Sequence, residues 1–207
     1  ALACAARAGN PWVSRADGVT GTRREPVELP PMRSDEEVKA IKEGKRPWAI
    51  VGHELDYAHR AWIEPGQWST AVMQRTNEKA AALYESWEKD LRWEEYRLED
   101  AELVIAAYGI SARIARSAVN LLRQEGYAVG LIRPITVNPF PYKAFDKIDY
   151  GKCKAVLDVE MSIPAQFLRD VSIGVKDRCP ITTCLCSGGN IMSRESIIEA
   201  AKKSLEA

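Results

Sequence analysis

Few side chains in this 207-residue sequence are candidates for catalysis or ligand binding, and two of them are only two positions apart. Asp158 and Glu160 end the apolar run KAVLDVE, and a run of that length is typical of a buried strand. Because α/β proteins bind ligands beside the carboxyl ends of parallel strands, Glu160 is a candidate for contact with a ligand or a neighbouring subunit. The alternative is an ion pair at a surface or an interface. We name no catalytic residue in this sequence.

Three other patterns are weaker pointers to chemistry. The sequence SGGN at 187–190 could present backbone N–H groups to a phosphate, with an ordinary strand-to-helix turn as the alternative. His53 and His59 have no cysteine or acidic cluster at metal-ligand spacing, and Cys184 and Cys186 alternate along an expected strand, so their thiols point to opposite faces. We therefore predict no metal site. The glycine patterns of dinucleotide and P-loop sites and the cysteine run of an iron–sulfur site are also absent from the sequence.

The composition excludes several classes of protein. The 29 basic and 29 acidic side chains balance, which argues against nucleic acid or an anionic membrane surface as the main partner. No apolar run approaches the ~20 residues of a membrane span and no signal sequence opens the chain, so we expect a cytoplasmic protein. The five cysteines are odd in number and scattered, which favours reduced thiols in a core.

The stretch from Ala101 to Pro141 organises the expected fold. It opens with an almost unbroken apolar run at 101–108, which is typical of a strand buried on both faces. Gly109 breaks the run, apolar residues then recur at helical spacing, and Gly126 supplies a helix stop. A second apolar run follows and ends in a loop rich in proline. The pattern predicts one right-handed β-α-β unit, and therefore a parallel sheet.

Two more apolar runs extend this sheet, and each is followed by a helical pattern, one opened by Pro164 and one beginning at Ser193. We predict one mainly parallel sheet with helices on both faces, an α/β fold of three layers, α/β/α. Its strands are expected at 102–108, 128–132, 154–159 and 181–186.

The first hundred residues carry less regular patterns. A strand-like piece at 11–16 has no partner strand nearby, and the simplest interpretation is a C-terminal fragment whose missing front half supplied one. Met73, Tyr84 and Leu91 lie in an apolar stripe that we expect to pack against another surface. The other expected elements are a helix at 1–8, a turn at 17–18, a linker at 25–31, a capped helix at 34–42, a short strand at 48–51, a loop at 53–68 and a long helix at 69–95.

Several long motifs together resemble one family. The sequence YGISARIARSAVNLLRQEGYAVGLIRPITVNPFP at 108–141 is preceded by EPVELPPM and RPWAIVG and followed by KAVLDVEMS and SGGNIMSRESIIEA. This series is similar to the C-terminal part of the α-type subunit of 2-oxoacid:ferredoxin oxidoreductases, of the branched-chain or 2-ketoisovalerate type. The resemblance covers nearly the whole chain.

The resemblance implies three regions. Residues 1–29 would be the end of the domain that binds the pyrimidine side of thiamine diphosphate, residues 30–100 a linker with a long amphipathic helix, and residues 101–207 a domain like the C-terminal domain of transketolase. The family usually reads D-G-x-x-G-Q where this sequence has DGVTGT, which makes Asp17 a second candidate for ligand or interface contact. Thr22 stands in place of the glutamine.

The resemblance also implies a function. The complete enzyme would oxidatively decarboxylate a branched-chain 2-oxoacid to acyl-CoA and pass the electrons to ferredoxin. Thiamine diphosphate and iron–sulfur clusters are expected in the complex and not on this fragment. The fragment would serve as a scaffold that contacts the other subunits, and ferredoxin and CoA would be reached through the complex. Alone, the fragment would be inactive. The alternatives are the C-terminal domain of another thiamine diphosphate enzyme, such as a transketolase or the β chain of a 2-oxoacid dehydrogenase, and a free-standing binding module.

Overall fold

The computed structural model describes residues 5, 10–45 and 69–206. The chain divides into two compact units, which are treated separately here: residues 1–15 with 23–83, and residues 16–22 with 84–207. The predictions for the strand at 48–51 and the loop at 53–68, with both histidines, lie outside the described residues, as does nearly all of the predicted helix at 1–8.

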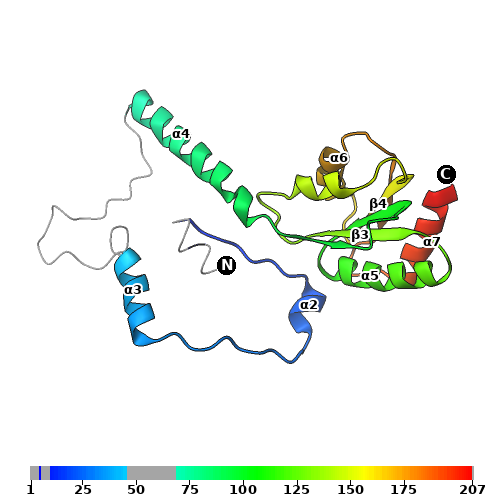
Figure 1. Ribbon diagram of the computed structural model, residues 1–207, viewed down its shortest axis with the longest axis horizontal. Helices are drawn as coiled ribbons and strands as arrows, with labels where there is room; N and C mark the ends of the chain where they lie inside the picture. Colours follow the sequence, from blue (N-terminus) through cyan, green and yellow to red (C-terminus); the bar gives the residue numbers. More distant parts are fainter. Residues whose placement is uncertain (1–4, 6–9, 46–68, 207) are drawn as a thin grey trace, which may run out of the picture. The chain divides into compact units, whose positions relative to one another are not determined.

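The first unit contains helix α3 (Asp35–Lys45), which confirms the capped helix predicted at 34–42 (Figure 1). Ser34 and Glu37 form a capping box: Glu37 N–H donates to Ser34 Oγ at 3.2 Å, and Ser34 N–H donates to Glu37 Oε2 at 2.8 Å. Acidic side chains fill the first turn, where they interact favourably with the positive end of the helix dipole. Local signals are therefore sufficient to define this helix.

The prediction of one helix over 69–95 is wrong. Helix α4 (Thr70–Ser86) is followed by a 3-10 turn, η2 (Trp87–Asp90), and by strand β1 (Trp93–Tyr96). Strand β1 forms because its backbone pairs in antiparallel fashion with a strand some forty residues later, and this long-range pairing overrides the helical pattern. The expected packing of the apolar stripe is also not found among the described residues, because α4 has no buried residue.

The strand-like piece predicted at 11–16 is irregular, and no strand among the described residues gives its backbone a ladder of hydrogen bonds. The turn predicted at 17–18 instead begins a short helix, α2 (Gly18–Thr22). Asp17 accepts a hydrogen bond from Thr20 N–H at 2.8 Å, which is the usual way for an aspartate to cap a helix.

The second unit is built on one five-stranded sheet with the order β1-β3-β2-β4-β5 (Figure 1). Strands β3, β2, β4 and β5 are parallel, and only the edge strand β1 is antiparallel. These four parallel strands are the four that the sequence predicts, so the prediction of a mainly parallel α/β sheet is confirmed. Their bounds are β2 Leu103–Ala107, β3 Val129–Pro134, β4 Ala155–Glu160 and β5 Ile181–Leu185.

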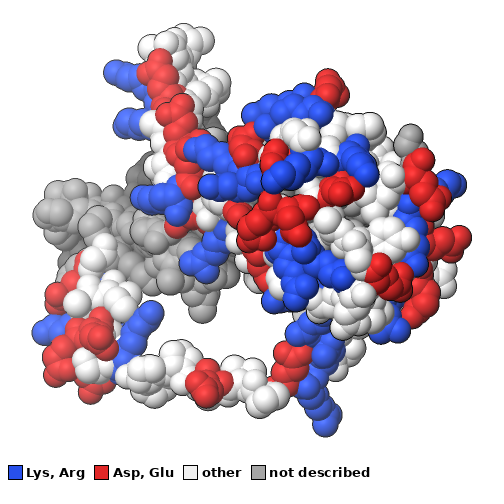
Figure 2. Space-filling model, turned by 45° about the vertical axis from the view of Figure 1, so that its right-hand side comes forward, with Lys and Arg blue, Asp and Glu red and all other residues white. Residues whose placement is uncertain are grey.

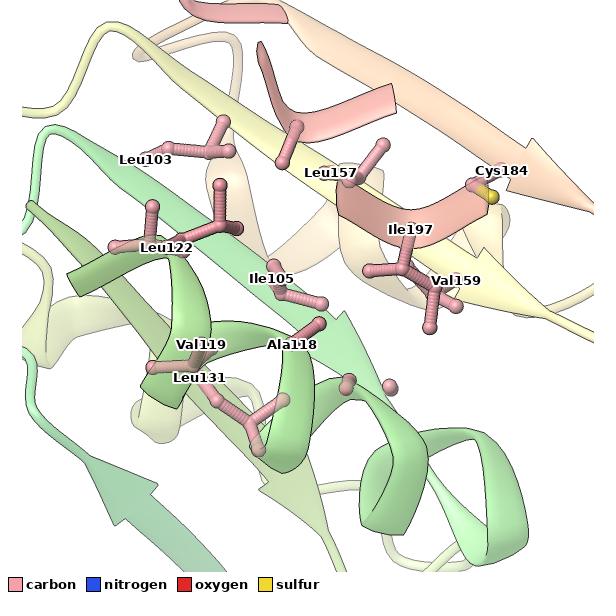
Figure 3. Packing of buried hydrophobic residues seen from close by; sticks show 14 of the residues in the cluster. Leu103, Ile105, Ala118, Val119, Leu122, Leu131, Leu157, Val159, Cys184 and Ile197 are labelled. Atoms are coloured by element: carbon pink, nitrogen blue, oxygen red, sulfur yellow. The ribbon is translucent and has the colours of Figure 1, made fainter. Parts of the chain in front are cut away.

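Helices α5 (Gly109–Gln124) and α7 (Arg194–Glu206) cover one face of the sheet, and helix α6 (Leu168–Val175) with the 3-10 turn η3 (Tyr142–Lys147) covers the other. Figure 3 shows the first core, where Leu103 and Leu157 of the strands face Leu122 of α5 and Ile197 of α7. All four side chains are fully buried. The three-layer α/β/α architecture is thereby confirmed.

The second core lies between the sheet and α6, and its largest fully buried side chain is Phe145. Gly174 of α6 gives this ring its space, because a Cβ at Gly174 would lie 2.5 Å from Phe145 Cδ2. Helix α6 begins at Leu168 and not at Pro164 as predicted, since Glu160 accepts hydrogen bonds from the backbone of residues 166–168 and fixes the helix start there.

Acidic and basic side chains are mixed on the face of the second unit that Figure 2 shows. Glu94 of β1, for example, forms ion pairs with Arg116 of α5 and with Arg133 of β3. Among the described residues, no helix is both long and apolar enough to cross a membrane.

Candidate ligand or interface site at the carboxyl end of the sheet

The two residues that we named from the sequence both lie at the carboxyl end of the parallel strands. Glu160 is the last residue of β4. Asp17 contacts the start of α5, directly after β2, because its Oδ2 accepts a hydrogen bond from Ile110 N–H at 3.1 Å. Strands β2 and β4 are neighbours and parallel, so the structure brings both residues to the same end of the sheet, where these strands have their carboxyl ends.

Glu160 is fully buried and its carboxylate acts as the cap of α6. It accepts hydrogen bonds from Gln166 N–H at 3.0 Å and from Phe167 N–H at 3.0 Å, and a further short one from the Ser162 hydroxyl. Burial raises the pKa of Glu160, but these donors outweigh it and hold the pKa below its ordinary value. Glu160 is therefore a charged structural carboxylate, and the surface ion pair considered as an alternative is not what the structure shows.

Asp158, two residues earlier on the same face of β4, has the opposite character. It is fully buried, no N–H or hydroxyl group among the described residues donates to its oxygens, and its hydrogen-bond partner is the carboxylate of Glu160, which accepts when Asp158 is protonated. Burial is the main reason that the pKa of Asp158 is raised to about 8, and the neighbouring charge of Glu160 raises it further. At neutral pH, Asp158 therefore carries a proton beside an ionised carboxylate.

Tyr108 is a partly exposed neighbour of this acid pair. It follows β2, and its ring packs edge-on against Phe167 with centroids 5.1 Å apart. Burial raises the pKa of the Tyr108 phenol, and the charges of Glu160 and Asp158 raise it further. Sequence reasoning missed Tyr108, although its position directly after a buried strand was visible.

Asp17 caps two helices at once. Its carboxylate accepts hydrogen bonds from Thr20 N–H and Thr20 Oγ in α2, and from Ile110 N–H in α5, whose own N-cap residue Tyr108 makes no side-chain capping bond. Burial raises the pKa of Asp17, but the hydrogen bonds hold it below the ordinary value. Gly109 has φ +56° and a Cβ there would lie 2.9 Å from Asp17 Oδ2, so only glycine permits this close approach.

The SGGN loop at 187–190 forms an ordinary turn. Asn190 donates to Ser187 O through its backbone N–H at 3.3 Å and through its side chain at 2.9 Å, while Gly188 and Gly189 have positive φ. The start of α7 is capped from within the chain, because Ser193 Oγ accepts a hydrogen bond from Ser196 N–H and Ser193 O accepts one from Ile197 N–H. The geometry favours the strand-to-helix turn over a phosphate site.

Exposed apolar side chains gather in the loops that leave the carboxyl ends of the strands. Tyr108 follows β2, Ile135 and Val137 follow β3, Ile163 follows β4 and Ile191 follows β5, and each is at least 42% exposed. We call these five residues the apolar edge. Contiguous exposed apolar patches are typical of surfaces that contact another protein, which makes the apolar edge a candidate for such a contact.

The described residues offer no metal site. Among them, no group of three or more histidine, cysteine or acidic side chains could hold a metal ion. Their four cysteines are free thiols, which confirms the prediction of reduced thiols for these four; Cys4 lies outside the described residues. The carboxylates at the carboxyl edge either cap helices or are protonated in the core.

Comparisons with known proteins agree with the fold and show which proteins this chain is similar to. Residues 101–197 match the family described as pyruvate:ferredoxin oxidoreductase core domain II. The ketoisovalerate oxidoreductase subunit VorB of Methanothermobacter marburgensis is 32% identical over 205 residues, which is 94% of this chain and 52% of that protein. The NADH-dependent phenylglyoxylate dehydrogenase subunit alpha of Aromatoleum evansii is 41% identical over 70 residues, 34% of this chain and 16% of that protein.

Among solved structures, a 2-oxoglutarate:ferredoxin oxidoreductase from Magnetococcus marinus aligns with 67% of this chain and 24% of its own, with a TM-score of 0.55 and 22% identity. At that identity the match shows the fold alone. The chain spans about half the length of the ketoisovalerate oxidoreductase subunit that it matches. The sequence similarity supports a relation to subunits of 2-oxoacid:ferredoxin oxidoreductases.

Proposed function

We propose that this chain is part of the α-type subunit of a cytoplasmic 2-oxoacid:ferredoxin oxidoreductase that oxidatively decarboxylates a branched-chain 2-oxoacid to acyl-CoA. The observation that carries the proposal is the 32% identity to a ketoisovalerate oxidoreductase subunit over 94% of the chain. The α-type assignment is supported by the shorter match to a subunit named alpha.

Within that enzyme, we propose that this part is a scaffold that contacts other subunits. Asp17 and Glu160 cap helices through most of their acceptor capacity, so their carboxylates serve the architecture of the carboxyl edge. The apolar edge beside them offers a surface for a neighbouring subunit. Thiamine diphosphate and the iron–sulfur clusters would be held elsewhere in the complex, and ferredoxin and CoA would be reached through it.

We propose three regions for this part of the subunit, from its resemblance to the family. Residues 1–29 would complete a thiamine pyrimidine-binding domain, residues 30–100 would link it to the next domain, and residues 101–207 would form the transketolase-like C-terminal domain. The exposed apolar side chains in the described part of the first unit, such as Leu29 and Met32, fit a segment that another domain or subunit covers.

The test is reconstitution of the complete subunit with its partner subunits. The complex should reduce a viologen dye only with CoA present, and 3-methyl-2-oxobutanoate should support a higher kcat/KM than pyruvate or 2-oxoglutarate. If pyruvate is preferred, the branched-chain assignment fails while the oxidoreductase assignment stands. If no 2-oxoacid supports dye reduction by the assembled complex, the function itself is wrong.

The scaffold role has its own test. Ile163→Glu places a charge on the apolar edge and should weaken assembly with the partner subunits, measured by size-exclusion chromatography. Ile173→Glu is the matched control, because Ile173 is similarly exposed but lies on α6, outside the apolar edge. Equal assembly of the two variants would contradict the interface. Glu160→Gln keeps an acceptor for α6, and loss of turnover in an intact Glu160→Gln complex would give this carboxylate a share in the chemistry.

A further inference from the structure

Two free cysteines meet at the end of the sheet opposite the apolar edge. Cys153 lies just before β4 and Cys179 just before β5, so both stand at the amino ends of neighbouring parallel strands. Cys153 is buried in the core between the sheet and α6, and Cys179 is partly buried against that same core. The sequence shows the two residues 26 positions apart, and nothing in their spacing indicates that they meet.

The strand register, extended beyond the paired residues, indicates that the two cysteines are close. Val156 pairs with Ile181, and the hydrogen bond from Val156 N–H to Pro180 O at 2.9 Å extends the pairing toward Cys179. If the register continues by two residues, Cys179 lies opposite Lys154, and Cys153 is one residue before Lys154. With a strand spacing of about 4.8 Å and this stagger of one residue, the Cα atoms of Cys153 and Cys179 lie roughly 6 Å apart. Disulfides are usually formed at Cα separations of about 4.4–6.8 Å.

The side chains also interact directly. Cys179 raises the pKa of Cys153 through its charge and a hydrogen bond, and Cys153 lowers the pKa of Cys179 through the same hydrogen bond, so the two thiols are close. The Cys153 thiol additionally donates to Ala155 O at 3.2 Å. Burial is the main cause that raises the pKa of Cys153 to about 12, with the neighbouring Cys179 as a further cause.

Cys179 is the better candidate for the thiol that peroxide reaches first, because it is partly exposed whereas Cys153 is buried. Burial raises its pKa, but the Cys153 hydrogen bond, the charge of Arg178 and the backbone of Val156 act in the opposite direction. The Arg178 guanidinium is held in place, because it donates to Gly174 O at 2.7 Å and lies 4.0 Å from the centroid of the Tyr150 ring. A fixed cation beside a partly exposed thiol favours its thiolate.

We propose that Cys153 and Cys179 are a dithiol modification site that a peroxide converts to an intramolecular disulfide. The Cys179 thiolate attacks one oxygen of hydrogen peroxide, the O–O bond breaks, and the departing hydroxide takes up a proton to become water. Cys153 then attacks the sulfenic sulfur as its own proton leaves, and the hydroxyl of the sulfenic acid departs with a proton as a second water. Two thiols lose two electrons, which reduce one peroxide.

The other two described cysteines serve as internal controls. Cys184 is buried in the core on the α5 and α7 face, where its thiol contacts Met192 Sδ and Ser196 O. Cys186, beyond the end of β5, donates to Asn190 O. Neither belongs to the core between the sheet and α6 that Cys153 and Cys179 share. A disulfide that forms by proximity therefore joins Cys153 to Cys179 and leaves Cys184 reduced.

The experiment exposes the complete protein, in its assembled state, to hydrogen peroxide at about pH 7 and about pH 9, followed by alkylation and mass spectrometry of chymotryptic peptides. Chymotrypsin is preferred because trypsin releases Cys153 in a dipeptide with Lys154, and since Cys179 and Cys184 stay on one chymotryptic peptide, fragmentation must tell them apart. The expected product is a cross-linked peptide pair, two hydrogen atoms lighter than the sum of the free peptides, whose fragments assign the bond to Cys153 and Cys179. It should form faster at the higher pH, because both pKa values lie above neutrality.

Variants sharpen the result. Cys153→Ala and Cys179→Ala should each abolish the cross-link, and Cys184→Ala, which removes a comparably buried thiol, should leave it unchanged. The proposal is overturned if both thiols of the wild-type protein are still fully alkylated at either pH under conditions that oxidise free glutathione. It is equally overturned by a cross-link that contains Cys184 or by a sulfinic acid at Cys179 without a cross-link. The wild-type measurement decides even if a variant fails to fold.

Discussion

The two units of this chain use apolar residues in opposite ways. In the second unit, Leu103 and Ile105 are fully buried within a sheet covered on both faces. In the first unit, no described residue is buried, and Leu29 and Met32 are more than four-fifths exposed. Helices form in both, so local signals are sufficient for a helix while a core depends on partners. Substitutions should therefore have large effects in the second unit and small ones in the first.

The largest effect is expected for Glu160→Ala. The substitution leaves the backbone N–H groups at the start of α6 without their buried acceptor, which should lower the free energy of unfolding by about 3 kcal/mol. Urea unfolding monitored by circular dichroism measures it. Glu160→Gln, which keeps one acceptor oxygen, should lose less, and equal losses would contradict the capping role.

Gly174→Ala should come next. The added Cβ would lie 2.5 Å from Phe145 Cδ2 and 2.7 Å from Phe145 Cγ, so the ring or the helix must move. Overpacking of this kind costs about 1–3 kcal/mol. Ile173→Ala, on the exposed side of the same helix, is the control and should change the urea midpoint little. A wild-type midpoint for Gly174→Ala would show that this core is looser than described.

Asp158→Asn should alter the pH dependence of stability. The pKa of Asp158 is about 8 in the folded protein and near its ordinary value when unfolded, so the folded state holds the extra proton between about pH 4 and pH 8. The stability that this proton provides is present at low pH and is lost as the pH rises toward 8. The variant, which cannot ionise, should lack this decline. Parallel slopes for the two proteins in unfolding experiments over that pH range would contradict a protonated Asp158.

Ser34→Ala should have the smallest effect. Removing the capping hydroxyl of α3 should cost the helix about 1 kcal/mol and increase amide exchange near Glu37. The urea midpoint of the second unit should stay unchanged, because α3 belongs to the first. A shift of that midpoint would show that the two units unfold together and would remove the contrast between them.

The sequence predicts the parallel strands well because each is an apolar run of strand length, and a run buried on both faces needs no knowledge of its neighbours. Strand β1 could not be predicted in the same way. Its residues WEEY are half polar, and what makes them a strand is the pairing of Trp93 with Pro134, far along the chain. The helical spacing of the preceding residues continues into β1, and only the pairing of β1 with β3 shows that the helix has ended.

The candidate site shows the same division. The position of Glu160 at a strand end was predictable from the sequence, and so was the interest of Asp17 through the family motif. Whether these residues contact a ligand or another subunit stays a prediction. Their capping roles depend on folded loops, and for Asp17 on a backbone donor 93 residues later, so no pattern in the sequence could reveal them. The protonation of Asp158 likewise depends on burial that becomes known only with the packing of the sheet.

The bond between Asp17 and Ile110 has a consequence for the order in which the protein is made. During synthesis, Asp17 leaves the ribosome 93 residues before the helix start that it caps. Asp17 can cap its own short helix at once, but its second acceptor position must wait until β2 and the first turn of α5 have emerged. The segment 16–22 therefore joins the second unit only after the start of α5 has emerged, and until then the second acceptor position of Asp17 is open to water.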